Sequence, residues 1–228
     1  MTPQVNGQVH HFVEHGLYDG LFLMRDEESG TYWDHLTGEA VYGDLVGQSL
    51  EIQPLEYSLA GQVLENYPEA VITFSDQALR KNDDLEMDGL LERTGGKLSG
   101  MFSSTIASED DRLPTMDLGI GIWSGKQARY YSYSEVIQAG NALLDDFHGQ
   151  QVLIFLDPDI QVLSAMYVNA EKLEWEQDLL RLSNGEHVAN SLLRDKSGEP
   201  LQMKRPLQVF TRWYGFALTF PDTEIYKP

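Results

Sequence analysis

Three histidines near the start of the chain are the first residues whose type and spacing could support chemistry. His10, His11 and His15 lie close together, with Glu14 and Asp19 beside them. His11 and His15 share a face on a strand and are four residues apart on a helix, so either structure could bring their imidazoles together. Two imidazoles and a carboxylate are ligands for zinc or copper. His11 and His15 are the candidate metal ligands. An exposed polar edge is the favoured explanation for them, and no metal is expected.

Asp34 and His35 form a second candidate pair, directly after Trp33. A carboxylate that contacts an imidazole can orient it as a general base. Neighbours on a strand point to opposite faces, which works against such a contact. The alternative is that Asp34 caps the turn at Leu36–Gly38 and that His35 is half-exposed. Asp34 and His35 are the candidate catalytic residues if the protein is an enzyme.

Other motifs lack the spacing that their chemistry needs. The glycines of Leu118–Gly125 are misplaced for a dinucleotide loop, and a strand follows them where a phosphate-binding helix should begin. Asp157-Pro158-Asp159 and Asp83–Asp88 carry carboxylates without the spacing of a calcium-binding loop. The chain has no Gly-x-Ser-x-Gly elbow, Walker loop or His-Glu-x-x-His motif. No cofactor is predicted.

The aromatic content is high, and a buried core is the favoured explanation for it. The chain has four tryptophans and 11 tyrosines, and a strand-rich core built from large rings would account for most of them. A platform for sugars or peptides would need at least two rings exposed on one face. Tyr18, Asp26 and Trp33 are the candidate binding residues.

Short strands separated by glycine-containing turns must position these residues. The strands predicted in the first part of the chain are Gln8–Val13, Leu21–Arg25, Thr31–Trp33, Ala40–Tyr42, Ser49–Gln53 and Ala70–Phe74. Asp26–Gly30 is a cluster of turn residues between two of them. Ser58 should cap a helix with an apolar stripe, and Pro68 should end it.

The second part of the chain is also predicted to consist mainly of short strands separated by turns. Its predicted strands are Leu118–Trp123, Ala128–Tyr131, Val152–Leu156, Val162–Val168, Lys172–Trp175, Leu179–Leu182 and Thr223–Tyr226. A capping box at Ser132 predicts a helix to about Ala139. Thr211 should cap a last helix with a buried aromatic face, ending at Pro221.

Two pairs of similar segments suggest that the halves are related. Ser58–Ile72 and Thr211–Ile225 both run from a cap through a helix and a proline to a strand, and Leu23–Thr31 resembles Leu192–Pro200. We therefore expect an α+β, strand-dominated, mainly antiparallel fold with two related halves, each with one buried helix. The predicted organisation is a first half at 1–78, an acidic connector at 79–115 with a short helix at Glu86–Arg93, and a second half at 116–228.

Composition excludes several functions. The 228 residues contain no cysteine, which excludes disulfides, cysteine-ligated metals and a cysteine nucleophile in this chain. The net charge of −20 disfavours nucleic acid and anionic membranes, and it suits either a solvated surface or a basic partner. No apolar run is long enough for membrane insertion. The start lacks the features of a signal peptide, so the expected location is cytoplasmic, or extracytoplasmic if the gene start is incomplete.

The segment Gly16–Gly43 carries a family resemblance. It is similar to the uncharacterised prokaryotic family catalogued as domain of unknown function 3179, through Gly16, Leu17, Leu21, Met24, Asp26, Ser29, Gly30, Trp33, Asp34, Leu36, Thr37, Gly38, Ala40 and Gly43. The ending Phe210–Tyr226 resembles the terminus typical of that family. Many members carry a Cys-Pro-x-Cys or selenocysteine-like element that implies redox or metal chemistry. Leu156–Ile160 stands at the equivalent strand here and has no cysteine, so that activity does not carry over.

These observations favour one function and leave two alternatives open. The leading hypothesis is a non-catalytic binding or scaffold module for an unidentified small molecule or protein. The first alternative is a metal-dependent or hydrolytic enzyme that uses the histidines and aspartates of the first half. The second is a degenerate member of a redox-type family.

Overall fold

Contacts divide the chain into two compact units in this computed structural model, which describes residues 1–71, 98 and 100–228. Of these residues, unit 1 contains 1–55, 98, 100–133 and 206–228, and unit 2 contains 56–71 and 134–205. Each unit therefore takes segments from both predicted halves, and the boundaries at 1–78 and 116–228 stay a prediction. The predicted helix at Glu86–Arg93 and most of the strand at Ala70–Phe74 lie outside the described residues.

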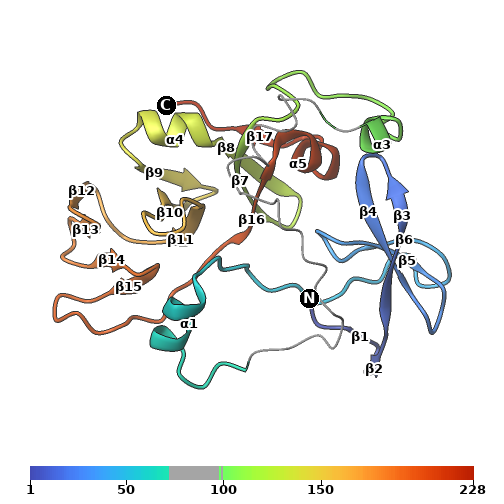
Figure 1. Ribbon diagram of the computed structural model, residues 1–228, viewed down its shortest axis with the longest axis horizontal. Coiled ribbons are helices and arrows are strands. Elements are labelled where there is room, and N and C mark those ends of the chain that lie inside the picture. Colours follow the sequence, from blue (N-terminus) through green and yellow to red (C-terminus); the bar gives the residue numbers. More distant parts are fainter. Residues whose placement is uncertain (72–97, 99) are drawn as a thin grey trace, which may run out of the picture. The chain divides into compact units, whose positions relative to one another are not determined.

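Unit 1 contains one small hairpin and two four-stranded sheets. The hairpin pairs β1 (Gln4–Val5) with β2 (Gln8–Val9). The first sheet is antiparallel and follows chain order: β3 (Phe12–Tyr18), β4 (Leu21–Asp26), β5 (Tyr32–Asp34) and β6 (Ala40–Tyr42), drawn in blue in Figure 1. The second has the order β16 (Leu207–Arg212), β7 (Leu118–Ser124), β8 (Gln127–Ser132) and β17 (Glu224–Ile225), with β17 parallel to β8.

Helix α5 (Trp213–Thr219) covers the second sheet of unit 1. Its Trp213 and Phe216 are fully buried and pack on Tyr130, at ring-centroid distances of 5.1 and 5.7 Å. Gly121 on β7 makes this approach possible, because a Cβ atom there would lie 2.1 Å from the Phe216 ring. The aromatic face predicted for this helix is therefore confirmed as buried, although Arg212 and not Thr211 is its N-cap residue.

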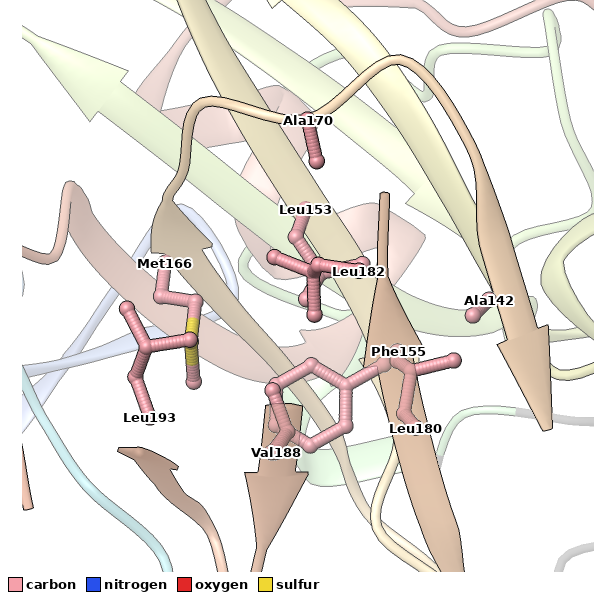
Figure 2. Close-up of a cluster of buried hydrophobic side chains, with 9 residues drawn as sticks. All are labelled: Ala142, Leu153, Phe155, Met166, Ala170, Leu180, Leu182, Val188 and Leu193. Atoms are coloured by element: carbon pink, nitrogen blue, oxygen red, sulfur yellow. The ribbon is translucent and has the colours of Figure 1, made fainter. Parts of the chain in front are cut away.

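Unit 2 packs a three-stranded sheet on a four-stranded one. The first has the order β11 (Leu163–Tyr167), β10 (Gln150–Leu156) and β9 (Ala142–Phe147), and the second is β12 (Leu173–Glu176), β13 (Leu179–Leu182), β14 (His187–Ala189) and β15 (Leu192–Arg194). Figure 2 shows their shared core, in which Phe155 of β10 and Met166 of β11 point toward Val188 and Leu193 of the other sheet. Alternation along each strand places these side chains on the inner faces.

The short helices differ from the expectations in detail. α4 (Tyr133–Gln138) follows Ser132 as predicted, and α3 (Gly100–Ser103) is a single turn that was not predicted. α1 (Ala60–Asn66) has Leu59 at its N-cap instead of Ser58, and Gln62 is its buried residue, while Leu59 and Leu64 are exposed. The expectation that the helix of the first half is buried is therefore wrong.

The prediction of a continuous strand at Ser49–Gln53 is also wrong. Ser49 bridges to Glu39, whereas Glu51 bridges to Thr2. Successive residues thus pair with different segments, and no continuous ladder forms.

The fold is α+β, strand-dominated and mainly antiparallel, as predicted. Within the described residues, every helix is too short or too polar to cross a membrane.

Candidate functional site

Two turns of the same kind shape the β3–β6 sheet of unit 1. Asp26 begins the turn between β4 and β5, and Asp34 begins the turn between β5 and β6. In each, the N–H of a glycine four residues later (Gly30 or Gly38) donates to the aspartate carbonyl, at 3.1 and 2.9 Å. Both glycines have φ +72°, which side-chain-bearing residues rarely adopt. The aspartate carboxylate accepts the N–H of the residue before the glycine, so the turn cluster expected at Asp26–Gly30 is confirmed.

The two aspartates face opposite sides of the sheet. Asp26 lies on the inner face and is fully buried with Trp33, whose Nε1–H donates to Asp26 Oδ2 at 2.8 Å. The backbone N–H of Ser29 donates to Oδ1 at 2.6 Å, and the Ser29 hydroxyl lies 2.7 Å from Oδ2. Nδ1 of His10, which is also buried, donates to Oδ1 at 3.2 Å. The candidate binding residues Asp26 and Trp33 therefore meet, but they meet inside the core.

The Asp26 carboxylate is held in its charged form. Burial acts to raise its pKa, but the hydrogen bonds from Trp33, Ser29 and His10 outweigh burial and hold the pKa well below its usual range. This is the electrostatic pattern of a structural carboxylate, because a general acid or base would need a pKa nearer to neutral.

His10, Asp26 and Glu28 are the described residues that come closest to a metal site. Their ligand atoms lie within 4.8 Å of one another. Both oxygens of Asp26 already accept hydrogen bonds from Trp33, Ser29 and His10, and a carboxylate has about four lone-pair positions. A cation would have to displace these donors. The geometry therefore fits a hydrogen-bonded core network better than a metal centre.

The structure does not bring the candidate metal ligands His11 and His15 to one site. Nδ1 of His11, which is exposed, lies 2.6 Å from Glu28 Oε1. The His11 pKa is raised, chiefly by this hydrogen bond and by the charge of Glu28, and the Glu28 pKa is lowered by the same contact. His15 instead packs edge-on against Tyr32, with ring centroids 5.2 Å apart.

Asp34 and His35, the candidate catalytic pair, also have separate partners. Asp34 Oδ1 accepts the N–H groups of Leu36 and Thr37 at 2.8 and 2.6 Å, which is the predicted turn cap. His35 Nδ1 donates to the Phe22 carbonyl at 2.8 Å. The Asp34 carboxylate therefore contacts backbone and does not orient the His35 imidazole.

The outer face of the β3–β6 sheet carries a row of aromatic rings. Tyr32 and Tyr42 pair across β5 and β6, with ring centroids 5.9 Å apart, and His15 also contacts Tyr32. Tyr42 is 72% exposed. Arg25 pairs with Tyr32 on the same face, because both residues alternate with the inward-pointing Met24 and Trp33. Tyr32 is half-buried, so Tyr42 and His15 are the exposed rings of this row.

A groove continues this face toward the start of β4. It has a volume of about 200 Å³, and its apolar lining includes Leu21, Leu23 and Val41. Tyr18, the third candidate binding residue, lines the groove and is 68% exposed. The charged residues of the lining are all acidic: Asp19, Asp34 and Glu39. We call the aromatic row and this groove together the outer sheet face.

Sequence reasoning missed Tyr32, Val41 and Tyr42. Tyr32 directly precedes Trp33 on one strand. Once Trp33 is assigned to the core, alternation places Tyr32 on the opposite, solvated face. That signal is present in the sequence. Val41 and Tyr42 are a different case, because the β5–β6 register shifts between Tyr32 and Trp33 and no sequence pattern marks the shift.

Comparison with known proteins identifies a family. The family described as "Protein of unknown function (DUF3179)" matches residues 2–223. No curated protein and no solved structure matches the chain. The match confirms the resemblance carried by Gly16–Gly43 and Phe210–Tyr226, and it spans nearly the full length: the chain belongs to this family of proteins of unknown function.

Proposed function

We propose that this protein is a non-catalytic binding module that recognises a peptide segment of a partner protein through the outer sheet face. One observation carries the proposal: the exposed aromatic row and the acidic-rimmed groove lie on the same face of one sheet. Tyrosine is enriched where proteins contact one another, since its rigid ring offers a large apolar area and a polar tip.

The charge of the groove indicates the composition of the peptide. Asp19, Asp34 and Glu39 line the groove, and the whole chain has a net charge of −20. A peptide that places an apolar side chain between Leu21, Leu23 and Val41 would bring flanking lysine or arginine residues near these carboxylates. The preferred ligand is therefore a basic peptide with at least one large apolar residue.

The separate partners of Asp34 and His35, the candidate catalytic pair, also support a binding function. Asp34 caps a turn, and His35 contacts a backbone carbonyl. A catalytic imidazole would instead contact the carboxylate that orients it.

A random peptide library screened against the full chain tests the proposal. We expect enrichment of basic peptides with a large apolar residue, and about tenfold weaker binding by Tyr42→Ala, because exposed aromatic anchors dominate such interfaces. Tyr67→Ala is the matched control, since Tyr67 is an exposed tyrosine of unit 2. Circular dichroism checks that both variants fold. Absence of enriched peptides, or equal binding by wild type and Tyr42→Ala, would refute the proposal.

A further inference from the structure

A second cavity lies entirely within unit 2 and is independent of the outer sheet face. Its volume is about 390 Å³, in the range of small-molecule sites. Leu156, at the end of β10, and Pro158, in the turn that follows, form part of its lining. Trp175 comes from β12. Ile137 of α4 adds to this lining, so the apolar part of the cavity comes from three segments of unit 2.

Trp175 lines this cavity, and its indole has an unsatisfied hydrogen-bond donor. Its indole packs against the unit 2 core, yet its buried Nε1–H has no acceptor among the described residues. The indole N–H groups of Trp33 and Trp213, by contrast, donate to Asp26 and to the Asp110 carbonyl. A buried indole N–H normally finds a partner. Trp175 is thus suited to donate to an acceptor atom that the described residues do not supply.

Side-chain amides and one carboxylate complete the lining. Asn141, Gln177 and Asp178 line the cavity, and within the described residues their side chains make no hydrogen bond. Gln161 donates its amide N–H to the Pro158 carbonyl at 2.8 Å, and its own carbonyl oxygen can still accept. The cavity therefore combines donors and acceptors with an apolar surface.

Three of these residues have an unusual backbone conformation. Asn141, Gln161 and Gln177 have φ values of 68°, 54° and 56°, and the described part of the chain has eight such residues other than glycine. Glutamine is not among the residues enriched in this region. Backbone hydrogen bonds hold two of the three in place, from the Asn141 N–H to Val136 and from the Gln161 N–H to Asp157. All three residues lie in turns, and all three line the one cavity.

We propose that this cavity binds a neutral saccharide. A sugar ring presents C–H groups that can pack on Trp175, Leu156 and Pro158. It also presents hydroxyl groups, which both donate and accept hydrogen bonds and so match amides, a carboxylate and an indole N–H. The lining has no lysine, arginine or histidine, which disfavours an anionic ligand, and its single carboxylate is a poor basis for a metal site.

The first experiment titrates the full chain by calorimetry with glucose, galactose, mannose, N-acetylglucosamine and their β-1,4- and α-1,4-linked disaccharides. At least one of these sugars should bind with a Kd of about 1 mM or tighter, and should change the tryptophan emission. Trp175 is the one tryptophan exposed beyond 5%, since Trp33 and Trp213 are fully buried and Trp123 is 5% exposed. If no sugar binds at concentrations up to about 10 mM, which would saturate a site of that affinity, the proposal is overturned.

Two variants locate the site. Trp175→Phe keeps an aromatic ring but removes the N–H, and it should weaken the sugar about tenfold. Gln177→Gly removes one amide and suits the positive φ at that position, so it should weaken binding several-fold without loss of fold. Glu174→Gln is the matched control, because Glu174 neighbours Trp175 on β12 and does not line the cavity.

The comparison of variants separates this site from the outer sheet face. A sugar that binds wild type, Trp175→Phe and Gln177→Gly equally would overturn the assignment of the cavity. Tyr42→Ala should leave sugar binding unchanged, so failure of peptide binding at the outer sheet face would not affect this result.

Discussion

Trp33 and Asp26 form a buried pair in which the indole Nε1–H donates to the carboxylate at 2.8 Å, and both side chains are fully buried. The two residues come from β5 and from the last position of β4, separated by a single turn. The Asp26 carboxylate thus links the Trp33 side chain to the backbone of the turn that precedes Trp33. This contact explains why two residues that resemble binding residues in the sequence are structural.

Removing the Asp26 carboxylate should destabilise the protein strongly. Asp26→Ala leaves the buried Trp33 indole N–H and the Ser29 backbone N–H without an acceptor. Hydrogen bonds to a buried charged group contribute about 1.5–3 kcal/mol each, so we expect a loss of about 3 kcal/mol in the free energy of unfolding, measured in urea. Asp34→Ala is the control. It removes the same turn contacts at a partly exposed position and should cost about 1 kcal/mol. Equal losses would contradict the structural role of Asp26.

The same carboxylate should make stability sensitive to acid. Because the Asp26 pKa is lower in the folded than in the unfolded protein, where it is near 3.8, its contribution is fully present above that value. As the pH falls further, the unfolded chain binds a proton that the folded chain does not, so stability is lost progressively toward the folded pKa. Asp26→Asn lacks this titration. Between about pH 5 and about pH 3 its free energy of unfolding should fall less than that of the wild type, and parallel curves would exclude the effect.

The His11–Glu28 contact predicts a pH dependence of the opposite sign. The His11 pKa is raised above 6.5 by the hydrogen bond to Glu28 and by the charge of that carboxylate. Its small contribution to stability is therefore present below the unfolded pKa and is lost as the pH rises through the folded pKa. An NMR titration of the His11 ring should show a lower pKa in Glu28→Gln. Glu27→Gln should have a smaller effect, because Glu27 acts on His11 only through its charge. An unchanged His11 pKa in Glu28→Gln would show that the contact does not form in solution.

Turn chemistry makes much of the β3–β6 sheet predictable. Asp26, Gly30, Asp34 and Gly38 mark two turns by residue type alone, since the aspartate caps and the glycine takes positive φ. The strands that adjoin these turns follow from the sequence to within a few residues. In contrast, β14 and β15 have three residues each, too few for alternation to stand out from the surrounding loop.

The binding sites are less predictable than the fold. Trp175 is one of four tryptophans, and its type and spacing do not distinguish it from the three that lie in cores. Its distinction is an indole N–H without an acceptor among the described residues, which depends on how β12 lies beside the end of β10. The positive φ values of Gln161 and Gln177 are equally hard to predict, because both residues lie in hairpin loops but glutamine does not favour this conformation.

Two glycine-to-alanine substitutions should have opposite effects on stability. In Gly121→Ala the new Cβ would lie 2.1 Å from the Phe216 ring, so α5 would have to move away from β7. Overpacking of this kind should cost about 3 kcal/mol in the free energy of unfolding. Gly61 lies inside α1, and a Cβ atom added there would have no other atom within 4 Å, so Gly61→Ala should stabilise that helix by about 1 kcal/mol. Chemical denaturation measures both. A Gly121→Ala protein as stable as wild type would mean that α5 does not rest on β7 at this residue, and the packing of Trp213 and Phe216 on Tyr130 would have to be reassigned.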